Sequence, residues 1–484
     1  MANPIALTMI VLYLVSTTLV GIWMVRRSRN SDGWSVAGGQ MGVLMIAVGI
    51  AGTRIGGAAT YGVAGDVIVG GVWNMWWYGI SAFLAMALVG LFFAIPYRRL
   101  RIQTVGEIFT MRFGTRRAQW LTSFCVQTEY AIVNVIEPYV IGRILSALTG
   151  IDFGPAVLIG GVIIVSYTAF GGLWGSAATN LIHCGAILFG FLAVGLVGLN
   201  HLGGWSNVVS GVNTALATNG VDADTWWRFT GHGWGDVMAM VFSAVIHTPA
   251  ASIYVNFATA ARNERSVLPA FVLGGLIAMP MPMLAGWIGI ESLAKYGATA
   301  QLTSYQTVTR LAAEINPFLG GIALAAVLAA VVSSGGPILL SSATMLVRDW
   351  WPASAAWDGP RKLRAYRITT IVYGMLAAVV AWLGPIGSIL DLLLFGFAMV
   401  VPPAIAAGYL LYWRRTTEAG VFWAIVVGYA CGLLWYLLWP DGPDPSYVTT
   451  LIPLLLVPLI SLATPDRVNG KDAFYGKLGT STEG

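Results

Sequence analysis

Apolar segments about as long as a membrane is thick recur along the whole chain, and they constrain its fold more than any other feature. The chain has 484 residues, of which 57% are hydrophobic and only 10% are charged. A soluble globular protein carries more charge than this. Because roughly 20 apolar residues make one membrane-spanning helix, the sequence predicts an all-α integral membrane protein with about 13 transmembrane helices.

The predicted spans are residues 4–25, 42–68, 73–96, 118–148, 153–171, 176–200, 234–259, 266–292, 317–347, 366–384, 387–412, 420–439 and 447–464. Beyond residue 466 the chain becomes polar and rich in glycine, which predicts a short disordered tail.

Basic residues indicate the topology. Arginine and lysine cluster after the first, third, seventh, ninth and eleventh spans, at residues 26–29, 98–117, 262–265, 348–367 and 414–415. Since such clusters stay in the cytoplasm, we expect a plasma (inner) membrane protein with its N-terminus outside and its C-terminus in the cytoplasm. The net charge is +5, and most of the lysines and arginines lie in these loops. We therefore expect the chain to lie in a lipid bilayer and not to bind nucleic acid.

With this topology, spans two to six run opposite to spans seven to eleven. The predicted division is a first flanking helix (1–30), a first inverted repeat (31–203), a second inverted repeat (204–415), two C-terminal flanking helices (416–466) and a cytoplasmic tail (467–484). Inverted five-helix repeats whose first helices are discontinuous are a transporter design.

The first helix of each predicted repeat contains one interruption. The first lies in the stretch AGTRIGGAATYG, residues 51–62, which places Arg54 beside Gly56 and Gly57 inside an apolar segment. A charge there costs roughly 2.5–3.5 kcal/mol, and glycine weakens a helix. The second is His247-Thr248-Pro249, where proline bends the helix. Both predict broken helices whose freed backbone groups line a polar cavity.

Four sequence motifs occur in one order along the chain. They are SDGWSVAGGQMG (31–42), TVGEIFTMRFG (104–114), FGGLWGSAATNLIH (170–183) and LAAVVSSGGPILLSSATMLVRDWW (328–351). Together they make the chain resemble members of the solute:sodium symporter family over roughly residues 30–415. The resemblance implies two inverted five-helix repeats, like those of the bacterial leucine transporter, and alternating access driven by a sodium gradient.

The same resemblance implies a sodium site. Matching the motifs gives as ligands the carbonyls of Gly52, Ile55 and Ala330 and the hydroxyls of Ser333 and Ser334, and oxygen ligands suit a hard cation. Alternatively, the two serines bond to their own helix or to a neighbouring one.

Two departures from the family pattern limit the ion coupling. Asn180 and His183 stand where many family members carry aspartate and glutamine. An amide offers no negative charge, so we expect no second sodium site and at most one sodium ion per cycle. Proton coupling through His183, Glu129 or Glu137 remains an alternative.

Arg54 needs a partner, because an unpaired guanidinium would repel sodium in a low dielectric. One candidate is a carboxylate of the fourth span, Glu129 or Glu137. The other is a carboxylate on the substrate, which arginine binds in a bidentate fork. The two are compatible if the substrate displaces the internal partner.

The predicted substrate is a small anion or zwitterion that bears a carboxylate. Trp76, in the cluster of residues 73–78, suggests a cation–π cage, but tryptophans at helix ends also serve as interface anchors. Arg54 and Ala250 occupy positions where the choline transporter of the family carries tryptophan, so choline is disfavoured. The candidate substrate-binding residues are Arg54, Gly57, Ala58, Trp76, Glu129, Glu137, His247 and Ala250.

The sequence thus predicts a secondary active transporter that takes up a small organic solute with sodium. Alternatives are a proton-coupled or uncoupled transporter of the same fold and a transporter-like membrane sensor. No catalytic nucleophile, base and acid occur at usable spacing, so an enzyme is not expected.

Overall fold

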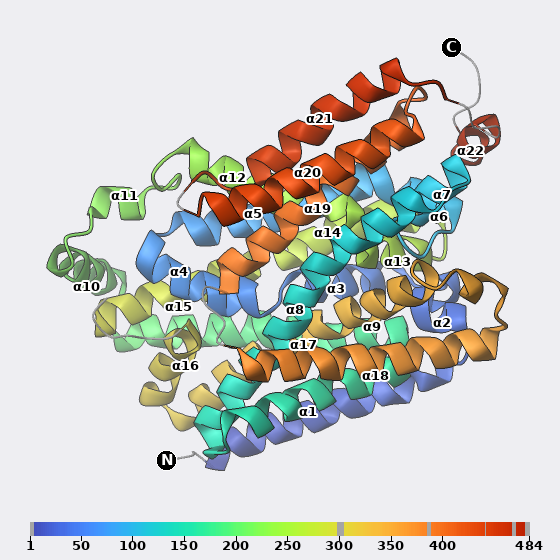
Figure 1. The fold of residues 1–484 in the computed structure, drawn as a ribbon. Helices are drawn as coiled ribbons and strands as arrows, with labels where there is room; N and C mark the ends of the chain where they lie inside the picture. Colours follow the sequence, from blue (N-terminus) through green and yellow to red (C-terminus); the bar gives the residue numbers. More distant parts are fainter. Residues whose placement is uncertain (1–3, 298–303, 385–388, 441, 467–470, 480–484) are drawn as a thin grey trace.

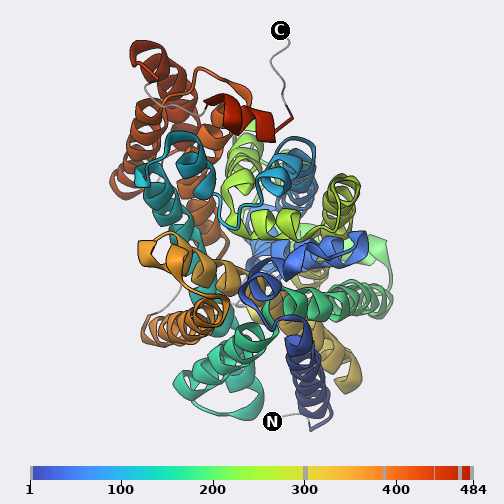
Figure 2. The same ribbon diagram turned by 90° about the vertical axis from the view of Figure 1, so that its right-hand side faces the viewer.

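The computed structural model describes residues 4–297, 304–384, 389–440, 442–466 and 471–479. Within these ranges the regular elements are all helices, and the one β-type pairing is an isolated bridge between Met41 and Ala261. Figure 1 shows most of the long helices running side by side in roughly one direction, and Figure 2 looks along them. The predicted all-α architecture is confirmed.

The α-helices of the first half are α1 (Pro4–Trp23), α2 (Ser31–Val36), α3 (Val43–Arg54), α4 (Val63–Gly70), α5 (Trp73–Leu88), α6 (Ala94–Leu100), α7 (Glu107–Phe113), α8 (Arg117–Thr149), α9 (Phe153–His201), α10 (Trp205–Thr218) and α11 (Ala223–Trp227). Those of the second half are α12 (Trp234–Ile246), α13 (Ser252–Ala260), α14 (Val267–Ala278), α15 (Pro280–Tyr296), α16 (Ser304–Ile315), α17 (Pro317–Arg348), α18 (Gly359–Leu383), α19 (Ile389–Tyr412), α20 (Glu418–Leu438), α21 (Ser446–Ala463) and α22 (Lys471–Lys477).

In the described part of the chain, nine helices are long and apolar enough to cross a membrane, or eleven if two bent pairs each count as one span. The predicted count of 13 is not confirmed by this criterion. One of the nine, α9, combines two predicted spans: Gly172 inside it has φ 58° and ψ −155°, outside the helical region. The 33-residue α8 is not among them, since Glu129, Glu137 and Arg143 lower its hydropathy.

Both predicted helix interruptions are present. The axis of α3 and that of the following segment Ala58–Gly70 differ by 60°, and the break lies at Ile55 and Gly56. Trp234–Ala250 and α13 differ by 52°. There the extended residue is Ala251 (φ −66°, ψ 102°), two positions later than the proline, because Pro249 fits the first turn of a short 3-10 helix, η5 (Thr248–Ala250).

The centre of the bundle is α17, which is buried along nearly its whole length. It packs against α9, α8, α18, α1 and α3. The contact with α3 brings Gly52 and Ile55, on either side of Arg54, next to Ser333, which is 281 and 278 residues away in sequence.

The predicted disordered tail is partly wrong. Residues 467–470 and 480–484 lie outside the described residues, but Lys471–Lys477 form α22, on which Phe474 and Tyr475 are buried. The Tyr475 hydroxyl donates to the carbonyl of Leu410 at 2.8 Å. Two aromatic side chains thus anchor a segment whose average composition is polar.

The arginine-rich loops meet at one end of the bundle. Arg99 pairs with Glu264 at 3.0 Å, Arg116 donates to the carbonyl of Arg348 at 2.6 Å, and Arg414 pairs with Asp472 at 3.0 Å. These contacts agree with the alternation of basic loops along the chain. Which side of a membrane this end faces stays a prediction.

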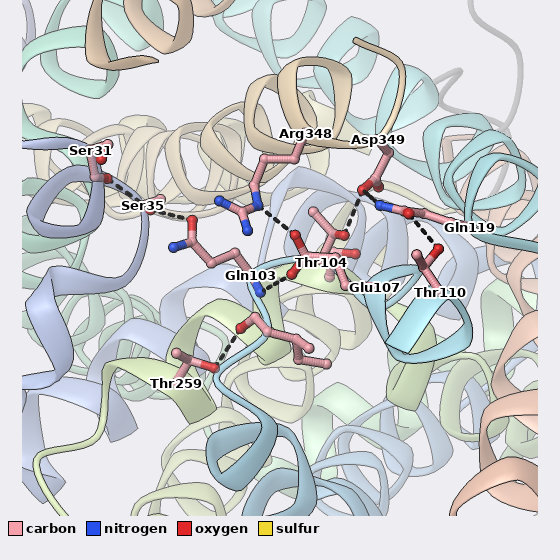
Figure 3. A network of polar contacts seen from close by, with 12 residues as sticks. Ser31, Ser35, Gln103, Thr104, Glu107, Thr110, Gln119, Thr259, Arg348 and Asp349 are labelled. Atoms are coloured by element: carbon pink, nitrogen blue, oxygen red, sulfur yellow. Dashed lines mark hydrogen bonds and ion pairs between the residues drawn. The ribbon is translucent and has the colours of Figure 1, made fainter. Parts of the chain in front are cut away.

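A polar network closes the same end (Figure 3). The Thr104 hydroxyl and the Gln119 amide donate to the Asp349 carboxylate at 2.8 and 2.6 Å. Arg348 pairs with Glu107 at 2.6 Å, and the Ser35 hydroxyl donates to Gln103 at 2.8 Å. Three motifs that are distant in sequence, at 31–42, 104–114 and 328–351, therefore build one structure.

The buried Asp349 predicts a pH-dependent stability. Burial away from water and, to a smaller extent, the nearby Glu107 carboxylate raise the pKa of Asp349 to about 7, against the hydrogen bonds from Gln119 and Thr104 and the charge of Arg348. A carboxyl whose pKa is higher in the folded than in the unfolded state binds more protons when folded, so stability falls as the pH rises from about 4 to 7.

We expect the melting temperature of the purified protein to fall by a few °C between pH 5 and 7.5 from this group, and Asp349→Asn to flatten that dependence. The asparagine oxygen still accepts both hydrogen bonds. Equal slopes for the two proteins in a pH series of thermal unfolding would show that Asp349 does not titrate in this range.

Candidate functional site

The break after α3 opens onto a cavity in the middle of the bundle. Its empty volume, including the part open to solvent, is about 480 Å³. Its polar lining comes from α3, α5, α8, α13 and α17: Thr53, Arg54, Tyr78, Glu129, Glu137, Tyr254 and Ser334. The other lining residues are Gly56, Ala58, Ala59, Val133, Ile136, Ile253, Ile338, Leu393 and Phe397.

Arg54 ends α3 and is only 5% exposed. Its Nη2 donates to the carbonyl of Ala244 at 2.5 Å, and its guanidinium lies 5.1 Å from the centre of the Phe397 ring. Ala244 is in the last turn of α12, where unpaired carbonyls give a helix its partial negative charge. The Nε atom has no hydrogen-bond partner among the described residues. This arginine is therefore held by a helix end and an aromatic face.

The predicted internal ion pair is not formed. Among the ion pairs of the described residues, none joins Arg54 to Glu129 or Glu137 within 4.0 Å. Glu137 instead accepts from the Ser334 hydroxyl at 2.5 Å and from the backbone amide of Gly57 at 3.3 Å. Glu129 is 4% exposed, and its Oε2 has no partner among the described residues.

The five atoms predicted as sodium ligands lie together between α3 and α17. The Ser333 Oγ is 2.8 Å from the carbonyl oxygens of Gly52 and Ala330 and 3.2 Å from that of Ile55. The Ser334 Oγ is 3.5 Å from the Ala330 oxygen. One hydroxyl has one proton and satisfies one of these carbonyls. The carbonyls of Gly52 and Ile55 lie at the break of α3, and their convergence with the serine hydroxyls gives an environment that fits a cation such as sodium.

Two glycines are needed for this close approach. A Cβ on Gly52 would lie 2.4 Å from the Asn180 Nδ2, and a Cβ on Gly56 would lie 2.4 Å from the Glu137 Oε1 and 2.6 Å from the Ser334 Oγ. Glycine here does more than weaken the helix, because it lets α8, α9 and α17 touch the backbone at the break.

The other predicted substrate residues divide into two groups. Ala58 lines the cavity, and Gly57 contacts Glu137 through its backbone amide. Trp76, His247 and Ala250 are not among the lining residues. Trp76 is 38% exposed. His247 is buried behind the cavity wall: its ring stacks on Phe397 at 4.0 Å and its Nδ1 bonds to the Ser243 carbonyl at 2.7 Å.

The remaining departures from the family pattern lie behind α3. The Asn180 Nδ2 donates to the carbonyl of Gly49 at 3.1 Å, and its Oδ1 has no partner among the described residues. His183 bonds through Nδ1 to the hydroxyl of Tyr13 on α1. Neither residue lines the central cavity.

Sequence reasoning missed three aromatic residues of the cavity: Tyr78, Tyr254 and Phe397. Tyr78 was a member of the cluster at residues 73–78, but its helical position turns it inward while Trp76 turns outward. The signal in the sequence is its two-residue offset from Trp76, which places Tyr78 on the other side of the helix. For Phe397, an aromatic residue in an apolar span, the sequence carries no such signal.

A second, larger cavity lies one helical turn nearer to the start of α19. It is lined by four carboxylates, Asp66, Asp236, Asp391 and Asp444, and by the aromatic residues Trp73, Trp435 and Tyr447. Its described lining includes no lysine or arginine. This acidic cavity would attract cations and repel anions.

Comparison with known proteins supports the family resemblance. The sodium/pantothenate symporter of Escherichia coli (strain K12) is 25% identical over 432 residues, covering 84% of this chain and 86% of that protein. The osmoregulated proline transporter OpuE of Bacillus subtilis (strain 168) is 23% identical over 449 residues, covering 88% and 87%. A solved Na+-coupled sialic acid symporter has the same fold, with a TM-score of 0.79 at 17% identity over 96% of this chain and 98% of that one.

The fold is therefore leucine-transporter-like, with two inverted repeats and broken first helices, as predicted. The model of the family described as "Sodium:solute symporter family" matches residues 34–428, which is well over half of the chain. This chain belongs to the sodium:solute symporter family, whose members carry solutes across membranes together with sodium.

Proposed function

We propose that this protein takes up a small organic solute bearing a carboxylate, together with one sodium ion per cycle. The evidence for a carboxylate on the substrate is Arg54. This buried, charged residue lines the central cavity, and no carboxylate of the described residues forms an ion pair with it. A buried charge without a counter-charge is costly. A substrate carboxylate would supply the partner in the bidentate geometry that a guanidinium favours.

The names of some similar transporters agree with this chemistry, whereas others name glucose or choline, which carry no carboxylate. Pantothenate, proline and sialic acid, named for three similar transporters, each carry a carboxylate. The support that they give is for the chemical class alone.

The proposed sodium ligands are the carbonyls of Gly52, Ile55 and Ala330 and the hydroxyls of Ser333 and Ser334. Their convergence supports this assignment. Glu137, bonded to Ser334 at 2.5 Å, would place a negative charge beside the ion and offset its repulsion by Arg54. Sodium would hold α3 against α17 while Arg54, which lies between Gly52 and Ile55 in sequence, meets the substrate.

The proposed transport route runs from one end of the bundle to the other. Solute and sodium would enter through the acidic cavity near the start of α19 while the polar network around Asp349 closes the arginine-rich end. Opening that network and closing the acidic cavity would release both into the cytoplasm. The N-terminus would lie outside and the C-terminus inside.

Removing the Ser333 hydroxyl tests the ion site. We expect Ser333→Ala to weaken sodium binding by at least about tenfold, because a lost polar contact to an ion is worth roughly 1.5–3 kcal/mol. The measurement is the midpoint of sodium-dependent thermal stabilisation of purified protein.

Ser341→Ala is the matched control, since Ser341 is also buried on α17 but is not one of the proposed sodium ligands and does not line the central cavity. An unchanged sodium midpoint in Ser333→Ala would refute the assignment. Stabilisation or uptake that follows pH and ignores sodium would favour the proton-coupled alternative.

Replacing Arg54 tests the carboxylate. In a ligand panel of carboxylates, amino acids, sugars and amines, each in sodium and in potassium, we expect the stabilising ligands to carry a carboxylate. Arg54→Gln should weaken their binding roughly ten- to hundredfold, and Arg54→Lys less, because lysine keeps the charge and loses the fork.

Arg143→Gln is the control for this test. Arg143 lies on α8 and packs on the rings of Tyr139 and Phe153, away from the cavity. If an amine or a sugar without a carboxylate stabilises the protein, or Arg54→Gln binds as the unaltered protein does, the carboxylate proposal is wrong.

A further inference from the structure

Two opposite charges face the central cavity without touching. Arg54 is 5% exposed and Glu129 is 4% exposed, and both line the cavity. They form no ion pair within 4.0 Å, and the Arg54 Nε and the Glu129 Oε2 have no hydrogen-bond partner among the described residues. Direct pairing would relieve the cost of burying both charges. A cavity that keeps them apart is complementary to a ligand that carries both charges itself.

The remaining carboxylate of the cavity already has its partners. Both oxygens of Glu137 accept hydrogen bonds, from Ser334 and from the amide of Gly57, and Ser334 is a proposed sodium ligand. Glu137 is thus committed to the ion side, whereas Glu129 is free for the substrate.

A charge count then selects the substrate. With ionised side chains, Arg54, Glu129 and Glu137 sum to −1, and one sodium ion brings the loaded site to zero. A zwitterion keeps the site neutral. An anion leaves one negative charge unless Glu129 binds a proton, and an amine leaves one positive charge. Uncompensated charge is expensive in a low-dielectric interior.

The acidic outer cavity favours the same choice. Its four aspartates repel an anion on the proposed route, whereas a zwitterion has no net charge and sodium is attracted. The rest of the inner cavity is apolar, with Ile136, Ile253, Ile338 and Leu393 in its wall. Such a wall suits an apolar side chain.

We infer that the substrate is a zwitterion of the amino-acid type with an apolar side chain, whose carboxylate binds Arg54 and whose ammonium group binds Glu129. The inference rests on the proposed function and sharpens it from carboxylates in general to one class. Glu129 is then the residue that distinguishes an amino acid from the corresponding acid.

The experiment uses matched ligand triplets with purified full-length protein in sodium and in potassium. Each triplet holds an amino acid, the same skeleton without the amine, and the same skeleton without the carboxylate: leucine, 4-methylpentanoate and 3-methylbutylamine; phenylalanine, 3-phenylpropanoate and 2-phenylethylamine; valine, 3-methylbutanoate and 2-methylpropylamine. Thermal stabilisation titrations give apparent dissociation constants.

We expect at least one amino acid to bind in sodium, with its two partial analogues at least roughly tenfold weaker. Glu129→Gln should abolish the preference for the amino acid over the acid. The variant should keep a cooperative thermal unfolding transition that sodium shifts upward, which reports that it is folded. Glu291→Gln, a fully buried glutamate on α15 outside the cavity lining, should leave the preference intact.

Acids that bind as tightly as the amino acids would overturn the inference and leave the proposed function standing. The same holds if Glu129→Gln keeps the preference, or if only acids bind. Binding by amines alone, or binding equal in sodium and potassium, would instead remove the proposed function as well.

Discussion

The contact between the broken backbone of α3 and Ser333 on α17 is the interaction on which the rest of the site depends. In a continuous helix the carbonyls of Gly52 and Ile55 would accept hydrogen bonds from residues four positions later. The break at Ile55 and Gly56 frees them, and they turn toward α17, where the Ser333 hydroxyl meets both within 3.2 Å. A lipid environment offers such carbonyls no water, so they need a hydroxyl or an ion.

Arg54 lies between Gly52 and Ile55 in sequence and lines the cavity. In the proposed function, sodium and substrate would therefore bind at the same helix break. Its charge is not cancelled by an internal carboxylate; a helix-end carbonyl and an aromatic ring hold it in place. Arg54, Glu129 and Glu137 line one cavity without pairing with one another. In the proposals above, Arg54 binds the substrate carboxylate, Glu129 binds its ammonium group, and Glu137 lies on the sodium side. In the proposed function, this arrangement would couple sodium and substrate through the backbone of residues 52–55.

Several features of this site could be predicted from the sequence because their signals are local. A charge beside paired glycines in an apolar span has few explanations, and the resemblance to the family motifs pointed to the five atoms that meet between α3 and α17. Phe397 and Tyr254 could not be found in this way, because an aromatic residue of a cavity wall and one of the apolar core are alike in sequence. Their places depend on how α13 and α19 pack. The missing ion pair of Arg54 and the ordered Phe474 and Tyr475 of α22 were likewise decided by tertiary contacts.

The central claim is that one helix break binds both sodium and substrate, and reciprocal binding tests it most directly. Sodium titrations of the purified protein, followed by tryptophan fluorescence, are made without substrate and with a saturating ligand from the panel, and the ligand is titrated with sodium and with potassium. The account predicts that each raises the affinity for the other by the same factor, of about 5- to 150-fold, as thermodynamic linkage requires. Affinities that do not depend on the other ligand would contradict it.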